Sequence, residues 1–366
     1  MKQIVYFLLV SVAPFLAIGQ QLSLVTALPG AVNETSGLLY LDQRIVTHND
    51  SGGEAALYEI DSATGNVLRK VTVTNATNVD WEAICADDTY LYIGDFGNNS
   101  GSRTDLKIYR ISLSDYREAE NDVVTAETIS FLYADQTDFT ATSYSTNFDA
   151  EALIAVDDKL YVFTKNWGNS QTNIYAVPKT PGTYQVQKSG SINVQGLVAD
   201  AAYDPGNNTL LLVGYTLLSP FMVGISGFSG ANFSDGVISR RQLSTVNGYS
   251  WQYEGVAFRG QGQYYLTAEE NGQRQSALYE LTTDIFTGDE SQQVLPGVMY
   301  PNPTSGILHI DQQGFALAEI YDLKGSLLKT VTTTDANLTE LSQGLYVIVL
   351  KNSAGDRICA QRLVVR

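Results

Sequence analysis

The sequence predicts an all-β protein: a five-bladed β-propeller followed by a small C-terminal β-sandwich. Three observations lead to this fold class, namely the composition, an internal repeat and a turn-rich C-terminal segment. The chain has 366 residues, of which only 17% are charged, and it contains 31 Gly and 22 Tyr. A disordered chain would be richer in charge and poorer in aromatic residues, and a coiled coil would be richer in Ala, Glu, Lys and Leu.

An internal repeat is the main signal for the architecture. Five short stretches share a small polar or acidic residue, then a small residue, then in most cases an aliphatic one. They begin at Ser36, Glu82, Glu151, Asp200 and Glu254. A period of this length is typical of propellers and other repeat folds.

Each repeat start is followed by the same order of strands. An apolar second strand comes about ten residues later, then a polar tip, and then a third strand in which β-branched and aromatic residues alternate. The second strands are 44–47, 91–94, 160–163, 210–213 and 264–267, and the third strands are 56–60, 107–111, 173–177, 221–225 and 277–281. More polar fourth strands are expected at 67–74 and 127–133. Four strands in each repeat indicate the blades of a β-propeller.

The repeats predict five blades over residues 20–296, with a long insertion near 115–147. Six blades are the alternative, but a sixth blade would need a hidden repeat. The last repeat ends after its third strand, near Thr282. The N-terminal strand 21–28 is therefore expected to supply the missing fourth strand, which would leave no exposed sheet edge at the closure.

The N-terminus has the form of a secretory signal peptide over residues 1–19. Lys2 is followed by an apolar stretch from Ile4 to Ile18, which ends in small residues near Gly19. No later segment is apolar for long enough to suggest a transmembrane helix.

The net charge of −17 argues against nucleic acid as a partner, because binding to phosphates depends on Lys and Arg. Two Cys and two His are too few for a disulfide scaffold or a His-rich zinc site.

A second domain is expected over residues 297–366, where short strands follow a turn cluster. Three motifs stand out: Tyr300-Pro301-Asn302-Pro303, then Ile320 to Gly325, then Leu341 to Val347. They closely resemble the C-terminal sorting domain of the type IX secretion system. The resemblance implies recognition of residues 299–366 by the type IX secretion machinery and export across the outer membrane. It also implies removal of this domain, followed by attachment to the outer cell surface or release as a secreted protein.

The five repeat starts are expected to converge around the central channel of the propeller. Carboxylates brought so close together disfavour joint ionisation unless a cation is present. Ca²⁺ accepts six to eight oxygen ligands, so we expect a calcium site formed by Ser36, Glu82, Glu151, Asp200 and Glu254. The alternative is that some of these side chains cap turns or accept hydrogen bonds from the backbone of neighbouring blades.

Two resemblances concern the propeller. The Ser and Glu residues at the repeat starts resemble the central calcium site of secreted calcium-activated nucleotidases, from which Asp200 departs. Motifs across residues 35–280 resemble the SdiA-regulated and esterase-like propellers. They are Asn49 to Gly53, Val79 to Glu82, Ile93 to Asn99, Asp149 to Leu153 and Tyr161 to Asn166. These resemblances imply a propeller, and the first also implies nucleotide hydrolysis.

Polar residues at the blade tips are expected to share one face or the channel mouth. Asn49, Asp95, Asn98, Asn166 and Glu269 are predicted to bind ligand there. His48, Asp50 and Lys165 are the candidate catalytic residues, since a His among acids can act as a general base. Trp167 is either a core residue or a platform for a sugar ring.

Three function classes stay open from the sequence. The first is an exported propeller that binds a small-molecule or surface ligand around a central calcium ion. The second is a metal-dependent hydrolase of phosphate or ester bonds that uses the same acids. The third is a passive adhesion module, for which neither ring nor tip residues would matter.

Overall fold

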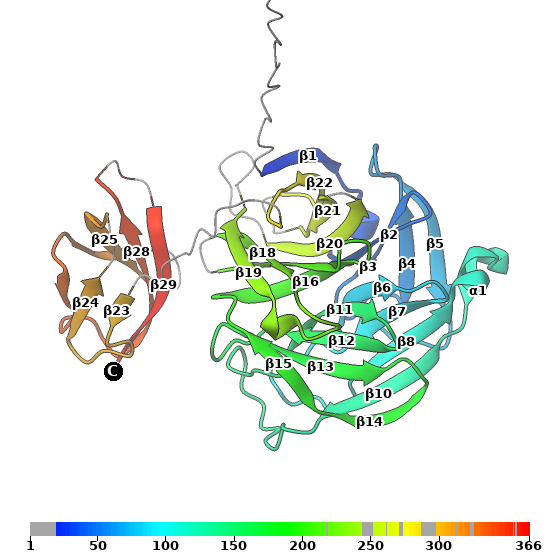
Figure 1. Cartoon of the computed structure of the whole chain (residues 1–366), viewed down its shortest axis with the longest axis horizontal. Coiled ribbons are helices and arrows are strands. Elements are labelled where there is room, and N and C mark those ends of the chain that lie inside the picture. The colour runs from blue at the N-terminus through cyan, green and yellow to red at the C-terminus, as the bar shows by residue number, and fades with distance from the viewer. Residues whose placement is uncertain are drawn as a thin grey trace, which may run out of the picture.

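The computed structural model describes residues 20–216, 219–243, 252–260, 262–270, 274–286, 298–311, 314–322, 326–353, 355 and 357–366. The predicted signal peptide and the predicted boundary at residue 297 lie outside these residues. Nearly all regular secondary structure in the described part of the chain is β-strand (Figure 1). None of its helices is long and apolar enough to cross a membrane.

Five sheets follow one another between Gln21 and Thr282. The first has β2 (Thr35–Leu41), β3 (Arg44–Asn49), β4 (Ala56–Ile60), β5 (Val67–Val73) and β9 (Val123–Val124), and the second has β6 (Trp81–Ala86), β7 (Tyr90–Asp95), β8 (Lys107–Ser112), β10 (Glu127–Tyr133) and β14 (Gly182–Val186). The third has β11 (Ala150–Val156), β12 (Lys159–Thr164), β13 (Thr172–Pro178) and β15 (Lys188–Ile192). The fourth has β16 (Leu197–Asp204), β17 (Thr209–Tyr215), β18 (Pro220–Ser226) and β19 (Val237–Gln242), and the fifth has β20 (Tyr253–Gly260), β21 (Gln263–Ala268), β22 (Ala277–Thr282) and β1 (Gln21–Ala27).

The predicted second and third strands of every repeat are present in these sheets. The 3₁₀ helices η1 (Gly30–Val32), η2 (Glu120–Asp122) and η3 (Phe233–Asp235) and the helix α1 (Leu113–Arg117) lie between strands. Helix α1 belongs to the predicted insertion and was not foreseen. Ser112 caps it, because its hydroxyl accepts a hydrogen bond from the Asp115 amide.

The first strands of the five sheets lie next to one another. β2 contacts β6 and β20, β11 contacts β6 and β16, and β16 contacts β20. A separate cluster of buried apolar side chains lies between each two successive sheets, including the fifth and the first. The architecture is therefore propeller-like, with the repeat starts near its centre and the later strands outside (Figure 1).

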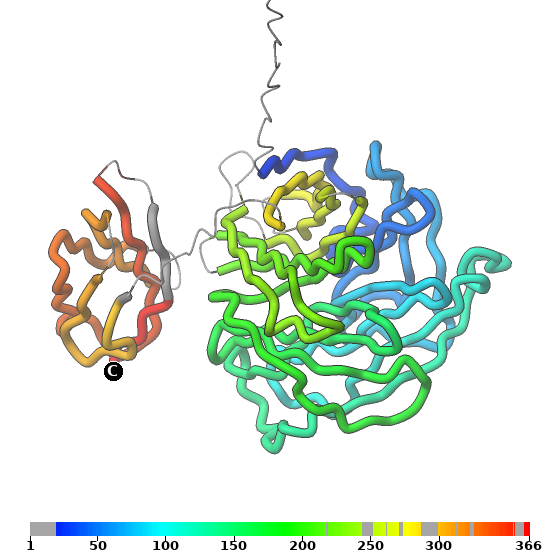
Figure 2. The backbone as a smooth tube through the Cα atoms, viewed as in Figure 1, coloured from blue at the N-terminus to red at the C-terminus, as the bar shows by residue number. Residues whose placement is uncertain are grey.

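The N-terminal strand occupies the position predicted for it. β1 pairs antiparallel with β22, from Gln21 opposite Thr282 to Ala27 opposite Ala277. Figure 2 shows this pairing as the blue start of the tube beside its yellow part. The fifth sheet thus combines the two ends of the repeat region.

Two further pairings link neighbouring sheets and could not be read from the repeat. The short strand β9 of the insertion adds parallel to β5, and β14 adds parallel to β10. Both pairings lie at the outer edge of a sheet. They cover main-chain groups that an edge strand would otherwise expose.

The C-terminal residues form two sheets with a core of their own. One sheet has β23 (Val298–Tyr300), β24 (Ile307–Asp311) and β27 (Asp335–Asn337). The other has β26 (Leu327–Val331), β25 (Leu317–Tyr321), β28 (Gly344–Lys351) and β29 (Arg357–Val365). Their apolar cluster includes Leu308, Ile320 and Ile348, and it shares no residue with the clusters of the propeller-like region. The expected small β-sandwich is present.

Candidate functional site

A β-bulge occurs at the same place in all five first strands. In each, one residue is skipped in the pairing with the second strand: Gly37, Glu82, Glu151, Ala199 and Glu254. A bulge redirects the side chain of the extra residue, and bulges are frequent beside functional sites. The structurally equivalent positions therefore carry three glutamates and two small residues.

This register corrects the predicted alignment of the repeats in two sheets. Ser36 lies one residue before the bulge of β2, and Asp200 lies one residue after the bulge of β16. A match of two or three residues cannot fix the register to a single position, and a shift of one residue turns a side chain to the other face of the sheet.

Asp200 has a structural role in the observed fold. Its side chain is fully buried, and its two carboxylate oxygens accept hydrogen bonds from the amides of Ala201 (2.8 Å) and Val256 (2.7 Å). It therefore links β16 to β20, as the alternative reading of the repeat starts foresaw. Ser36 also links two sheets, because its hydroxyl donates to the main-chain oxygen of Glu82 at 3.3 Å and to its Oε2 at 3.5 Å.

Lys165 lies among the bulge glutamates. Its Nζ is 3.0 Å from Oε1 of Glu151, and both side chains are buried. The ammonium group also lies 5.3 Å from the ring centre of Trp167 and 5.1 Å from that of Tyr215. Burial by itself would lower the pKa of Lys165, but the charge of Glu151 and other acids holds it well above its ordinary value. Glu151 therefore already has a cation supplied by the protein.

Three other carboxyl groups converge, and among the described residues none of them forms an ion pair with Lys or Arg, although the Lys165 charge offsets part of the rise in the pKa of Asp50 and Glu82. Asp50 follows β3, Asp80 precedes β6, and Glu82 is the bulge residue of β6. One oxygen from each lies within 4.8 Å of the other two. We call these residues the acidic triad. A Cβ atom at Gly97 would lie 2.4 Å from both Asp80 Oδ2 and Glu82 Oε1, so a side chain at this position would displace the two carboxylates.

The pKa values of the three carboxyl groups are raised, which shows that bringing them together in a buried place disfavours their ionised forms. Burial, together with the neighbouring Asp50 and Asp149, raises the pKa of Asp80 to about 7. Burial is also the main reason why the pKa values of Asp50 and Glu82 are raised. Close to these groups, burial and Glu254 raise the pKa of Glu269 to about 7. These carboxyl groups resist joint ionisation near neutral pH.

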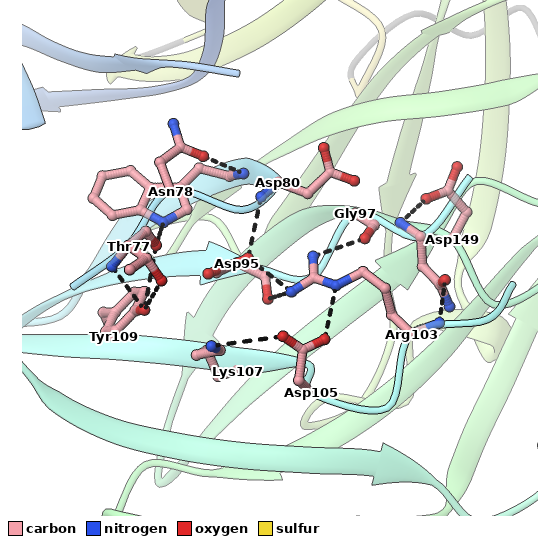
Figure 3. Close-up of polar contacts among 12 residues, drawn as sticks. Thr77, Asn78, Asp80, Asp95, Gly97, Arg103, Asp105, Lys107, Tyr109 and Asp149 are labelled. Atoms are coloured by element: carbon pink, nitrogen blue, oxygen red, sulfur yellow. Dashed lines mark hydrogen bonds and ion pairs between the residues drawn. The ribbon is translucent and has the colours of Figure 1, made fainter. Parts of the chain in front are cut away.

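Asp95 and Arg103 hold the main chain at Asp80 in place (Figure 3). Asp95 is fully buried, and its Oδ1 accepts from the Asp80 amide at 3.2 Å and from Arg103 Nη2 at 3.0 Å. Arg103 also donates to the Gly97 main-chain oxygen at 2.9 Å. Asp95 was predicted to bind ligand, whereas these contacts give it a role in positioning the Asp80 segment.

The predicted Asn residues mostly hold loops in place. Asn98 donates its main-chain N–H to Asp149 Oδ1 at 2.6 Å and its side-chain amide to the Phe148 oxygen at 3.2 Å. Asn49 donates to the Ala31 oxygen at 3.0 Å. The buried Asn166 accepts from the Thr164 hydroxyl at 2.6 Å.

His48 is fully buried rather than placed at a tip. Its ring packs edge-on against Trp81, with 5.6 Å between the ring centres, and its Nδ1 lies 3.1 Å from the Asn49 oxygen. Burial lowers the pKa of His48 to about 4, so the imidazole is neutral at physiological pH.

Sequence reasoning missed Asp80 and Asp149 as site residues. Each precedes a bulge glutamate by two positions, in Asp80-Trp81-Glu82 and Asp149-Ala150-Glu151. This shared Asp-x-Glu spacing was a signal that could have found them.

A surface pocket of about 590 Å³ contains none of the predicted site residues; Thr77, Lys107 and Tyr109 are among its lining residues (Figure 3).

Comparisons with known proteins place only the C-terminal domain. Several solved structures share a distant fold resemblance. An aldose sugar dehydrogenase of Streptomyces coelicolor is 13% identical with a TM-score of 0.44, covering 72% of this chain and 98% of that chain. A gluconolactonase of Xanthomonas campestris is 15% identical with a TM-score of 0.38, covering 80% of this chain and 86% of that chain. Such scores assign no activity.

The search of curated proteins found no match. Residues 298–366 match the family described as the secretion system C-terminal sorting domain. This match implies recognition by the type IX secretion system and export to the cell surface or secretion. The C-terminal sandwich is thus a type IX sorting domain.

Proposed function

We propose that the chain is an exported five-bladed β-propeller that binds Ca²⁺ at the acidic triad and a further ligand at the same mouth. The observation that carries the proposal is the convergence of Asp50, Asp80 and Glu82 within 4.8 Å. The sorting domain would deliver this mouth to the outer cell surface.

The packing of the sheets supports the five-blade count. Five first strands contact one another in series, and five apolar clusters separate five sheets. Because β1 completes the fifth sheet, the repeat region leaves no sheet short of four strands. A distant kinship with SdiA-regulated propellers or calcium-activated nucleotidases is compatible with this arrangement.

The donor set of the triad suits Ca²⁺ better than a transition metal. All three ligands are carboxylates, and Ca²⁺ takes six to eight oxygen atoms, so water and ligand oxygens would complete its shell. Zinc and copper favour His and Cys, which are absent from this cluster. A divalent cation would also relieve the repulsion that raises the pKa of Asp80.

The proposed calcium site is displaced from the one expected at the channel centre. Glu82 remains a ligand, and Ser36 positions its carboxylate. Glu151 is paired with Lys165, so its charge is already balanced. Glu254 lies near Lys165, and burial raises the pKa of Glu254 even though the Lys165 charge acts against that rise.

Calcium titration of the full chain tests the proposal. Isothermal titration should show calcium binding that Asp80→Asn and Glu82→Gln each weaken at least about tenfold, equal to about 1.4 kcal/mol. Asp88→Asn, a change in an exposed turn, is the matched control. Gly97→Ala should weaken binding as well, whereas Gly30→Ala, where a Cβ has open space, should not.

Thermal melts provide the second readout. A bound ion that favours the folded state raises the melting temperature, and EDTA should remove that increase. No calcium uptake together with an unchanged melt in EDTA would overturn the calcium proposal. Calcium uptake that persists in both Asp80→Asn and Glu82→Gln would mean that calcium binds at a different site.

A metal-dependent hydrolase is the second candidate. It is favoured by the pKa of Glu269, which lies near 7 and suits a general acid or base. Turnover of aryl phosphates, nucleotides or aryl esters should then depend on calcium and fall strongly in Glu269→Gln. A panel without calcium-dependent turnover would count against hydrolysis and leave the binding proposal intact.

A further inference from the structure

Three loops beside the triad form a surface of a different chemical character. They are residues 98–102, 142–147 and 167–171, and we call them the Tyr144 surface. The loops contain Asn, Ser, Thr, Gly and Gln together with two aromatic residues, but no Asp, Glu, Lys or Arg. In a chain with a net charge of −17, this neutral patch stands out.

The two aromatic residues are in contact, and one of them, Tyr144, is exposed. Tyr144 is 64% exposed, and its ring centre lies 4.8 Å from that of the partly buried Trp167, at an angle of 67° between the rings. Tyr144 also has a φ of +55°, a left-handed conformation that is rare for a bulky side chain. Large apolar side chains are normally scattered singly on a protein surface, so an exposed and strained tyrosine against a tryptophan indicates a binding role.

Hydrogen bonds hold the three loops together. The Tyr144 amide donates to the Asn99 oxygen at 3.0 Å, and the Trp167 amide donates to the Thr146 oxygen at 3.0 Å. The Trp167 indole N–H donates to Asp149 Oδ2 at 2.7 Å. The aromatic pair is therefore oriented before any ligand arrives, which lowers the entropy cost of binding.

The polar groups of this surface suit a neutral ligand. Tyr and Trp offer rigid flat area, while Ser, Asn and Gly offer adaptable hydrogen bonds, a combination that is common in binding surfaces. Arg362 of the sorting domain donates to the main-chain oxygens of Trp167 (3.1 Å) and Gly168 (3.2 Å). Two main-chain acceptors of the surface are thus occupied by a donor from outside the propeller-like region.

We propose that the Tyr144 surface binds a neutral saccharide, with the apolar face of a sugar ring on Tyr144 and its hydroxyl groups on the surrounding amide, hydroxyl and carbonyl groups. The inference rests on the proposed function in placing a ligand at this mouth, and it names the class of that ligand. Asp149 links the two features, because it accepts from Asn98 beside Gly97 and also from Trp167. Binding of the sugar does not itself require the metal.

Affinity electrophoresis of the full chain tests this inference. Starch, laminarin, xylan and galactomannan serve as neutral probes, with polygalacturonate and chitosan as charged ones. Every protein carries Arg362→Ala, so that the sorting domain does not occupy the two carbonyl oxygens. We expect retardation by at least one neutral polysaccharide. The Tyr144→Ala change should weaken that binding at least about tenfold.

Matched variants distinguish a direct role of the Tyr144 ring in saccharide binding from a general effect of the substitution on the protein. Tyr144→Phe keeps the ring and should retain binding, and Tyr300→Ala removes an exposed tyrosine of the sorting domain and should change nothing. The saccharide should also quench the fluorescence of Trp167, a signal absent from Trp167→Phe.

Two results would overturn the inference: no retardation by any neutral probe, whether or not the charged probes retard the protein, or equal binding by Tyr144→Ala. The electrophoresis is repeated in EDTA and with Glu82→Gln. Saccharide binding that persists under both conditions supports a saccharide site that is independent of the metal. If the protein with Glu82 intact binds saccharide but takes up no calcium in a titration without EDTA, the calcium proposal is refuted and the saccharide site is supported. Calcium uptake without saccharide binding would do the reverse.

Discussion

Single residues in the mouth show how the fold tolerates buried charge. Lys165 neutralises Glu151, Arg103 neutralises Asp95, and Asp200 is satisfied by two main-chain amides. Each is buried beside a specific partner, as buried ionic groups require. The acidic triad differs from them because no Lys or Arg ion pair is found with its members in the described part of the chain.

Removal of the Lys165 charge should destabilise the protein strongly. Lys165→Met leaves Glu151 buried without its partner, and breaking such a pair costs about 3–5 kcal/mol. Lys188→Met is the control, because Lys188 is 44% exposed and lies 3.8 Å from Asp135, and it should change stability by less than about 0.5 kcal/mol. Urea unfolding measures both. Equal effects of the two variants would contradict a special role for the buried pair.

His48 should make folding sensitive to acid. Its pKa is about 4 in the folded protein and near 6.5 when unfolded, so the unfolded chain binds more protons between these values. Stability from the neutral imidazole is complete above pH 6.5 and is lost as pH falls toward 4, by about 3 kcal/mol in total.

Urea unfolding in EDTA from pH 7 to pH 4 measures this loss. His48→Gln should lack that part of the pH dependence, while His309→Gln, in the sorting domain, should keep it. The raised carboxyl pKa values act in the opposite direction, but they are common to all three proteins. Identical pH profiles for wild type and His48→Gln would refute the assignment.

At the level of elements, the β-bulges place the glutamates of the candidate site, and the closing strand β1 completes the fifth sheet. Every first strand carries its bulge at the same register position, so three repeats can turn a glutamate toward the centre. β1 adds the fourth strand of the fifth sheet, and its Leu22 packs against the apolar cluster between the fourth and fifth sheets.

Deletion of β1 should weaken the fifth sheet first. A chain that lacks residues 20–27 leaves β22 unpaired on one side, since β1 is its outer neighbour. Hydrogen exchange should accelerate in residues 277–282, while residues 172–178 in the third sheet should exchange as before. Uniform acceleration in all sheets would instead show that the ring opens as one unit.

At the scale of the whole molecule, two separate cores predict two unfolding events. The apolar cluster of the sorting domain contains only residues between Met299 and Val365. Leu308→Ala should lower only the transition of the sorting domain, and Leu212→Ala only that of the propeller-like region, each by about 2–5 kcal/mol. Both side chains are buried. Differential scanning calorimetry distinguishes the two, and one transition that moves with both variants would contradict the separation.

The sequence by itself determined the all-β class, the five repeats, the second and third strands of each, the closing strand and the sorting domain. The β class and the individual strands depend on local alternation and turn chemistry. The closing strand follows from counting strands in the repeats, and the sorting domain follows from motifs that resemble the type IX family. The linear pattern also brought Glu82, Glu151 and Glu254 to equivalent positions.

Only the tertiary structure decided which charges meet. Asp200 accepts a hydrogen bond from Val256 of β20, 56 residues further along the chain. Lys165 meets Glu151 across the paired strands β11 and β12, where the bulge at Glu151 sets which side chains face each other. The one-residue bulge offsets of Ser36 and Asp200 are equally invisible in short motifs. The contact of Tyr144 with Trp167 depends on loops 23 residues apart that main-chain hydrogen bonds draw together. Partners of this kind follow from the packing of whole sheets, and local pattern carries no information about them.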